Sequence, residues 1–367
     1  MAQTTAILPS ARPLLVRLVL AIGLALAALL CALAGCDGSL TGAIGPNDDI
    51  ELFSDFPRGD ERTQVLDAFL TRPVETPVRP EAPFTVLRTD STAFRRMRDW
   101  RTLVFLGDMR TSRWGARQSR RLLTREGYER LVSQPAGSVM LSDVWATGQT
   151  VWLVHAVSAE ALRQKLDEDP GLLRKLEEKV IDGLGKTLYL NGEQGEIARG
   201  ISRRHGYEIR IPKDFMVEED AGNRFVRMKR IQPDEPVSFF LIYYEPSRLS
   251  DDDPRLATYC TALRDTLAAL YFGGDRVEPS RTRANWVDFQ GRRTLEIYGL
   301  YQNDNPPMGG PFRSYCFQEN GRLYLIDQAV FNPPGKKLPQ LRLLEAIART
   351  LRLGPDGAAG PSALVTP

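Results

Sequence analysis

The stretch Val237-Ser238-Phe239-Phe240-Leu241-Ile242-Tyr243-Tyr244 decides the fold of the C-terminal half of this 367-residue chain. Its apolar and aromatic run predicts a central β-strand that is covered on both faces. We expect Phe225–Met228 to pair with it. Three further strands are predicted downstream, at Leu295–Tyr301, Arg313–Gln318 and Leu323–Phe331. This half of the chain is therefore predicted to form an antiparallel sheet.

Two amphipathic helices are predicted to flank this sheet. The first follows Asp253-Pro254, because an aspartate N-cap followed by proline is a strong helix start. Its apolar residues recur on one stripe: Leu256, Tyr259, Cys260, Leu263, Leu267 and Leu270. The second helix spans Pro339–Leu353 and closes the domain. The three aspartates Asp251, Asp252 and Asp253 could bind calcium, but Asp253 as the cap, with the other two near the positive end of the helix, explains them without a metal.

The N-terminal half alternates strands with helices. Strands are expected at Ile50–Phe53, Phe84–Leu87, Leu103–Leu106 and Val151–Val157. The predicted secondary structure changes from helix-rich to strand-rich near residue 200, so we place a domain boundary within Gly192–Gly200. The predicted class is α+β, with two α/β domains over residues 47–198 and 199–353. A flexible tether is expected over residues 36–46 and a disordered tail over residues 354–367.

Leu33-Ala34-Gly35-Cys36 closes an uncharged run that begins at Leu18, after the basic residues Arg12 and Arg17. A large aliphatic residue, two small residues and a cysteine are typical of a lipoprotein signal. Cleavage after Gly35 would leave Cys36 to carry diacylglycerol and a further chain such as palmitate. The alternative is an uncleaved anchor, since the run is just long enough to span a bilayer. We predict lipid attachment at Cys36 and a signal peptide over residues 1–35.

Two cysteines remain once Cys31 leaves with the signal and Cys36 takes lipid. Outside the cytoplasm, Cys260 and Cys316 can form a disulfide between a helix and a strand. The alternative is a free thiol at Cys260, which lies on the apolar stripe of its helix. The spacing of the cysteines does not suggest a metal site.

Charge and motifs exclude several classes of function. The signal carries two arginines and no acid, so the remaining chain has 46 acidic residues and as many basic ones. The remaining chain has no net positive charge, so its charge does not favour nucleic acid as a partner. Gly183-Leu184-Gly185-Lys186-Thr187 resembles the end of a phosphate-binding loop, but it lacks the first glycine and closes a predicted helix. With His155 and His205 as its only histidines, the sequence predicts no metal and no cofactor.

The most unusual stretch beyond the signal runs from Asn303 to Phe312. It carries Asn303, Asp304, Asn305, Met308, Gly309, Gly310 and Phe312, together with three prolines. This composition predicts a rigid polar loop that ends in apolar side chains and could bind a partner. The alternative is a long hairpin connection with ordinary turn chemistry.

Several motifs together resemble a known family. They are Gly45-Pro46-Asn47-Asp48-Asp49-Ile50, Asp143–Gln149, His205–Pro212, Met308–Phe312 and Pro333–Lys337. They resemble the bacterial lipoprotein family catalogued as domain of unknown function 4837, over roughly residues 45–353. The resemblance implies a lipoprotein but no catalytic residues. At the level of fold alone, the second half is similar to PsbP-like domains, and fold does not imply function.

Two functions are compatible with these residues. The first is a non-enzymatic lipoprotein in the envelope of a Gram-negative bacterium, held on the inner or outer membrane by its lipid. It would bind an envelope protein or another envelope component. The alternative is an envelope hydrolase that uses sheet carboxylates such as Glu296 and Asp327, which would have to share a cleft.

Overall fold

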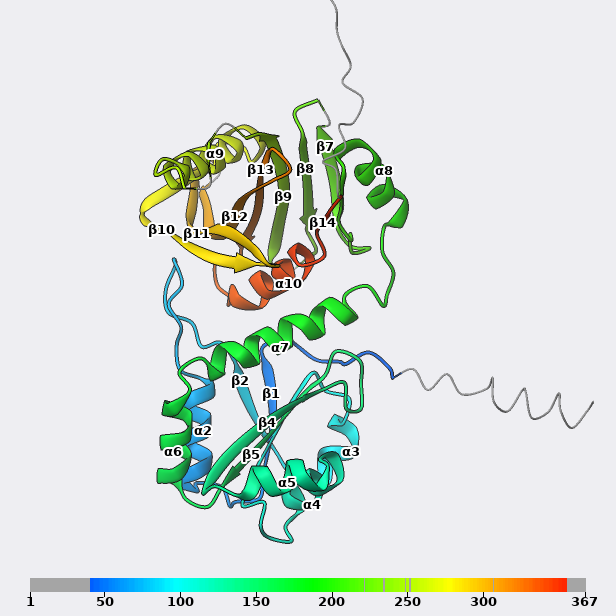
Figure 1. Ribbon diagram of the computed structural model, residues 1–367, viewed down its shortest axis with the longest axis vertical. Helices are drawn as coiled ribbons and strands as arrows, with labels where there is room; N and C mark the ends of the chain where they lie inside the picture. The colour runs from blue at the N-terminus through cyan, green and yellow to red at the C-terminus, as the bar shows by residue number, and fades with distance from the viewer. Residues whose placement is uncertain are drawn as a thin grey trace, which may run out of the picture. The chain divides into compact units, whose positions relative to one another are not determined.

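The Val237–Tyr244 stretch lies in a seven-stranded antiparallel sheet of the computed structural model, which describes residues 40–220, 222–233, 235–247, 249–250, 252–305 and 307–354 (Figure 1). The sheet order is β10-β11-β12-β13-β9-β8-β7. Strand β9 (Val237–Pro246) pairs with β8 (Phe225–Arg230) as predicted, and its other edge pairs with β13 (Arg322–Phe331). The remaining strands are β7 (Met216–Asp220), β10 (Arg276–Phe289), β11 (Arg292–Asp304) and β12 (Pro307–Glu319).

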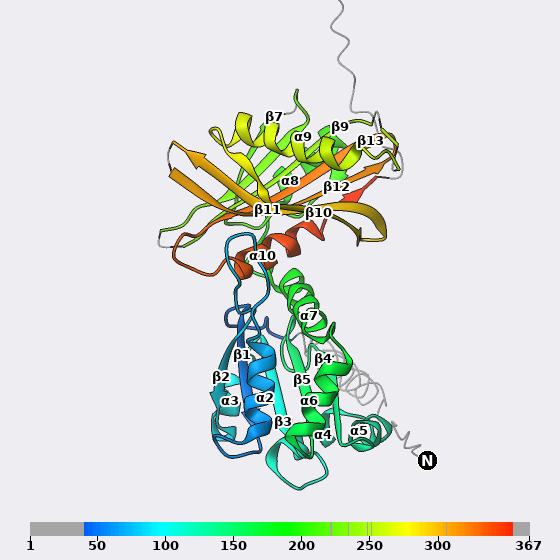
Figure 2. The same ribbon diagram turned by 90° about the vertical axis from the view of Figure 1, so that its left-hand side faces the viewer.

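Each face of this sheet is covered, which explains the unbroken apolar run in β9 (Figure 2). On one face, α10 (Leu338–Ala348) and α8 (Gly195–His205) pack on a core that includes Phe240 and Ile326. On the other face, α9 (Leu256–Tyr271) packs on Leu241 and Leu325. Two short strands, β6 (Tyr207–Glu208) and β14 (Arg352–Leu353), pair beside α8.

A disulfide joins α9 to β12. Cys260 and Cys316 are both fully buried, with their Cα atoms 6.3 Å apart. Of the two alternatives for this pair, the structure has the bonded one. The hairpin after β12 turns at Asn320 and Gly321, whose φ angles of 53° and 73° suit a tight turn.

The N-terminal half holds a second, five-stranded sheet in the order β2-β1-β3-β5-β4 (Figure 1). Strands β1 (Asp49–Ser54), β2 (Thr85–Thr89), β3 (Thr102–Gly107) and β5 (Thr150–Ala156) are parallel, and β4 (Ala136–Ser142) is antiparallel. The two faces have separate cores. Helices α2 (Glu61–Leu70), α6 (Ala159–Glu168) and α7 (Leu172–Thr187) cover one face. Helices α3 (Phe94–Met97), α4 (Trp114–Leu122) and α5 (Arg125–Val132) cover the other, after the short 3₁₀ turn Ser91–Ala93.

The tether predicted over residues 36–46 is wrong for the part that the structure describes. Gly42 forms a β-bridge with Thr147, and Ile44 forms one with Trp100. Ala43 is buried between them. The chain is therefore fixed to the N-terminal sheet from Gly42 onward, because these backbone groups find partners there.

Several predictions concern residues that the structure does not describe. Gly35 and Cys36 lie outside the described residues, as do residues 355–367 of the predicted tail. Among the described residues, no helix combines the length and apolar character needed to cross a bilayer. The described residues from Thr41 to Gly354 belong to one compact unit. The boundary at residues 198–199 stays a prediction, and it falls within α8.

Candidate functional site

The predicted binding loop at Asn303–Phe312 is mostly strand. Strand β11 continues to Asp304 and β12 begins at Pro307, so the segment is a hairpin, as in the alternative. Phe312 is fully buried beneath Arg264, whose Cζ lies 3.9 Å from the ring centroid. Asn303 Nδ2 donates to Gly273 O and to Asp275 Oδ1, both at 2.9 Å. The prediction that this loop ends in apolar side chains available to a partner is therefore wrong, because Phe312 is buried in the hydrophobic core.

The two glycines of this segment also belong to β12. At Gly310 a Cβ atom would lie 1.9 Å from Val330 O, so only glycine fits against the neighbouring strand. Gly309 is similarly close to Tyr301 O. Met308 is half-buried, which leaves Asp304 and Asn305 exposed at the turn.

The predicted carboxylates Glu296 and Asp327 lie on opposite faces of the sheet. Asp327 faces α9 and is buried in an ion pair with Arg264, with Arg264 Nε 3.3 Å from Oδ1. Glu296 is opposite Tyr315 in the register and faces the α10 side. Side chains on opposite faces of a sheet cannot act on the same bond. The hypothesis of a hydrolase that uses this pair of carboxylates is therefore wrong.

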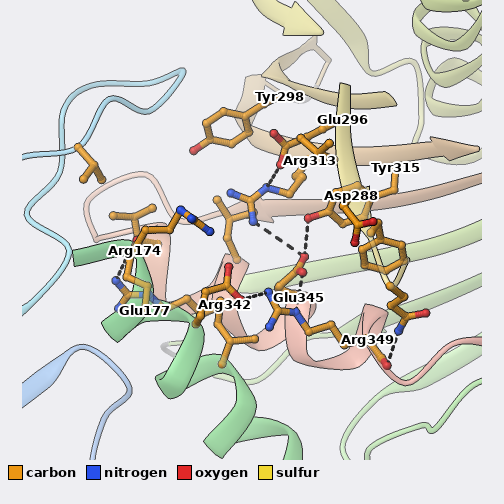
Figure 3. A pocket seen from close by; sticks show the side chains of 18 of the residues that line it. Arg174, Glu177, Asp288, Glu296, Tyr298, Arg313, Tyr315, Arg342, Glu345 and Arg349 are labelled. Carbon is orange, nitrogen blue, oxygen red and sulfur yellow. Dashed lines mark hydrogen bonds and ion pairs between the residues drawn. The ribbon is translucent and has the colours of Figure 1, made fainter. Parts of the chain in front are cut away.

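A large cleft lies on the α10 side of the sheet, with a volume of about 1240 Å³ (Figure 3). Its walls come from α7, α10, strands β10–β12 and the segment at Val74-Glu75. In Figure 3, side chains from the sheet face side chains from the two helices across the cleft. The polar lining residues are arginines, carboxylates, tyrosines and one glutamine: Glu75, Arg174, Glu177, Glu178, Arg283, Asp288, Gln290, Arg292, Glu296, Tyr298, Arg313, Tyr315, Arg342, Glu345, Arg349 and Arg352.

Glu345 of α10 is the centre of the hydrogen-bond network at the base of the cleft. Its Oε2 accepts from Tyr315 Oη at 2.9 Å and from Gln328 Nε2 at 3.3 Å. Its Oε1 accepts from Arg349 Nε at 2.9 Å. Burial, together with the Glu345 charge, raises the pKa of Tyr315 well above its ordinary value. A carboxylate with both oxygens engaged is a fixed acceptor that holds other groups in place.

Arg342 of α10 and Arg349, the C-cap residue of that helix, connect this base to α7. Arg349 pairs with Glu178 at 2.6 Å and with Asp182 at 3.2 Å. Arg342 pairs with Glu177 at 2.6 Å. Since these guanidinium groups already face carboxylates, their charge is neutralised within the protein.

Arg174 and Arg283 differ from these arginines. Both are exposed at the cleft, and neither forms an ion pair within the described part of the chain. Arg283 lies over the ring of Tyr298, with 5.5 Å between Cζ and the ring centroid, and Arg313 contacts the same ring at 5.3 Å. Burial raises the pKa of Tyr298 to about 12, so its hydroxyl stays protonated at neutral pH and can donate. The cleft thus offers cationic groups without a carboxylate partner beside a tyrosine hydroxyl.

A smaller hollow of about 650 Å³ adjoins the cleft between α7, α8 and the β6–β14 pair. The two cavities share Ile181, Arg349 and Arg352. No cluster of three or more histidine, cysteine or acidic residues suited to a metal occurs within the described ranges. The arrangement is suited to binding polar, charged groups.

Of the polar cleft residues, sequence reasoning named Glu296 alone as a candidate site residue. One signal was available, because Arg342, Glu345 and Arg349 recur at helical spacing along an otherwise apolar helix. Charged residues at this spacing on an otherwise apolar helix indicate a polar site where the helix meets its neighbours. The strand residues Arg283 and Arg313 carried no comparable signal, because charged residues on strands normally mark the solvent face.

The fold defines an α+β protein in which a covered antiparallel sheet carries a charged cleft. Residues 195–350 match the family described as domain of unknown function 4837. The resemblance is thus confirmed for this segment, while the motifs at Gly45–Ile50 and Asp143–Gln149 lie outside the match. No curated protein sequence matches the chain.

Several solved structures share parts of the fold. Cyanobacterial PsbP from Synechocystis sp. PCC 6803 is 15% identical, with 41% of this chain and 88% of that chain covered at a TM-score of 0.29. LpqN, described as involved in cell envelope biogenesis of Mycobacterium tuberculosis, is 10% identical over 41% and 83%, with a TM-score of 0.26.

A protein from Bacteroides thetaiotaomicron VPI-5482 is 12% identical over 41% of this chain, with a TM-score of 0.26. The chain spans 46% of that protein's length. With TM-scores this low, none of these likenesses carries an argument about function.

Proposed function

We propose that this protein is a lipid-anchored module of the bacterial cell envelope that binds an anionic ligand in the cleft between α7 and α10. The observation that carries the proposal is the contrast between two sets of arginines. Arg342 and Arg349 are neutralised by carboxylates of the protein, whereas Arg174 and Arg283 face the cleft without a carboxylate partner among the described residues. The first set supports the walls, and the second is available to a ligand.

The fixed network favours binding over catalysis. Glu345 accepts hydrogen bonds from three side chains, so it is a positioning group and not a free acid or base. The ordered walls reduce the entropy lost when a ligand binds, because few side chains must be immobilised. An envelope component that carries carboxylate or phosphate groups fits this chemistry.

The proposed location in the cell envelope is supported by the signal at Leu33–Cys36 and by the disulfide. A bond between Cys260 and Cys316 is typical of proteins outside the cytoplasm, where thiols oxidise. Two or three acyl chains on Cys36 would hold the protein on a membrane almost permanently, at about 0.8 kcal/mol per buried CH₂.

The ligand proposal is tested by titration calorimetry with three probes. We expect a carboxylate-bearing muropeptide or glycerophosphoglycerol to bind, and neutral chitotriose not to bind. The first two probes separate a peptidoglycan source from a lipid-headgroup source.

Charge reversal in Arg283→Glu or Arg174→Glu should weaken binding at least tenfold, because a charge-assisted hydrogen bond contributes about 1.5–3 kcal/mol. Arg125→Glu, on the exposed surface of α5, is the matched control and should bind as the wild type does. If neither anionic probe binds, or if reversal at both positions changes nothing, the cleft is not an anion site.

The anchor proposal has its own test. Cys36→Ala should abolish incorporation of labelled palmitate and leave a precursor of full length, because the acceptor thiol and the cleavage signal are lost together. Cys31→Ala serves as the control and should be labelled normally. Labelling that survives Cys36→Ala would overturn the assignment.

A further inference from the structure

The segment that connects the signal to the N-terminal sheet is firmly held. Ala43 N donates to Thr147 O at 2.9 Å, and Ile44 N donates to Asp99 O at 3.0 Å. Gly42 lies against Leu190, so closely that a Cβ atom at Gly42 would be 2.6 Å from Leu190 Cδ1. The segment is therefore held by backbone hydrogen bonds to residues 99–101 and to Thr147, and Gly42 lies beside Leu190, which follows α7.

The buried side chain of Arg101 helps to hold this segment in place. Its Nη2 donates to Ala43 O at 3.2 Å, and its Nη1 donates to Thr187 Oγ1 at 3.0 Å. Arg101 N also donates to Ile44 O at 2.8 Å. Since one buried side chain ties the segment to α7 and to the sheet, the segment cannot swing freely.

The chain outside this fixed segment is short. Residues 37–40 alone separate Cys36 from Thr41. At about 3.3–3.6 Å per residue, the lipidated cysteine can be at most about 18 Å from Thr41. A membrane that holds Cys36 must therefore lie close to the surface at which the segment joins the domain.

Exposed aliphatic side chains gather at that surface. Ile44 is 53% exposed and Leu190 is 58% exposed. Gly42 brings them together, because Leu190 lies against Gly42 and Ile44 is two residues further along the chain. Single exposed apolar residues are ordinary on protein surfaces, whereas a group of them indicates an interaction site.

Two exposed arginines shortly precede, in the chain, the residues that hold Ile44. Arg95 and Arg96 of α3 are exposed, and neither forms an ion pair within the described ranges. They precede Asp99 and Trp100, which pair with Ile44, by only a few residues. Aliphatic side chains with neighbouring unpaired arginines are complementary to a bilayer that contains anionic lipid.

We propose that the anchor-proximal surface, defined by Ile44, Leu190, Arg95 and Arg96, rests on the anionic membrane that carries the lipid of Cys36. The proposal depends on the lipid anchor of the proposed function, but not on the cleft. The surface fixes how the domain is oriented on the bilayer, which the lipid alone would not do.

Full-length protein in vesicles of phosphatidylethanolamine and phosphatidylglycerol tests this contact. Ile44→Cys and Leu190→Cys are labelled with an environment-sensitive NBD maleimide. Leu270→Cys, on α9 and 71% exposed, is the control. With Cys36 lipidated and Cys260 bonded to Cys316, the introduced cysteine is the intended target of the dye.

We expect NBD at positions 44 and 190 to shift to shorter wavelength on vesicles, while position 270 keeps its aqueous spectrum. The shift should shrink in phosphatidylcholine vesicles and in Arg95→Glu/Arg96→Glu protein. Aqueous spectra at all three positions, on protein with lipidated Cys36, would overturn the membrane contact. Labelling of Cys36 itself in the wild type would instead overturn the anchor.

Discussion

Glu345 is the residue on which the walls of the cleft depend most. It is 2% exposed and accepts hydrogen bonds from Tyr315, Gln328 and Arg349. Arg313 is also nearby, with NH1 3.9 Å from Oε2. The negative charge of Glu345 thus balances guanidinium groups from both the sheet and α10.

We expect Glu345→Gln to lower the free energy of unfolding by about 2–3 kcal/mol. The amide keeps the shape of the side chain but removes the charge and turns one acceptor into a donor that faces Arg349 or Tyr315. Urea denaturation followed by circular dichroism measures the change. Glu196→Gln, in an exposed ion pair on α8, should change stability by less than about 0.5 kcal/mol. Equal stability of the two variants would contradict the role of Glu345.

At the same scale, the sequence predicted the chemistry of buried cysteines better than that of charged residues. Cys260 and Cys316 were candidates for a bond because only two cysteines remained in an oxidising setting. Glu296 and Asp327 looked equivalent in the sequence. Their separation depends on strand parity and on which helix covers each face, and neither can be read from a charged residue alone.

The hairpin of β11 and β12 shows where prediction of the elements succeeded and where it failed. The cores of both strands were predicted, but the polar ends were assigned to a loop between them. Asn303 and Gly310 suggested a turn, although Asn303 caps a neighbouring loop and Gly310 allows a close approach of strands. Residues typical of turns can serve packing instead.

Strand β10 and helix α8 were not predicted at all. Strand β10 is exposed along most of its length and has a register break between Glu278 and Arg283, so its sequence lacks the alternation of a half-buried strand. Helix α8 contains two glycines and lies where the domain boundary was expected. Tertiary packing, rather than local propensity, determines both elements.

The contact between α9 and β12 gives a prediction at this scale. Replacing both Cys260 and Cys316 by alanine should lower the free energy of unfolding by about 4 kcal/mol, since the bond closes a loop with a sequence separation of 56. Urea denaturation of the variant measures this loss. Reduced wild-type protein is the control and should lose a similar amount, whereas an unchanged midpoint in both samples would show that the bond contributes nothing.

For the whole molecule, the two sheets are connected through a few charged contacts. Arg342 reaches Pro83 O at 2.9 Å as well as Glu177, and Glu81 accepts from Lys337 N at 2.9 Å. Because α10 carries or adjoins these groups, the last helix takes part in both the cleft and the contact between sheets. The sequence showed none of these contacts, since they join residues more than 150 positions apart.

Buried tyrosines throughout the molecule predict unfolding in base. Burial raises the pKa of Tyr189, Tyr243 and Tyr298 to about 12 each, from 10. Between pH 10 and 12 the unfolded chain loses these protons while the folded protein keeps them. Stability is therefore complete below pH 10 and falls as the pH rises toward 12.

Tyrosinate absorbance at 295 nm and circular dichroism should then change together above pH 10. Protein unfolded in urea is the control, and its tyrosines should ionise near pH 10 without a cooperative step. A folded protein whose tyrosines all ionise near pH 10 would contradict this expectation.

Strand β13 occupies a position with a consequence for biosynthesis. It is the last long strand of the chain, yet it inserts between β12 and β9. Synthesis proceeds from the N-terminus, so the ribosome releases two open strand edges before residues 322–331 exist to close them. A nascent or truncated chain that ends before Phe331 exposes both edges at once, and it needs a chaperone until the final strand arrives.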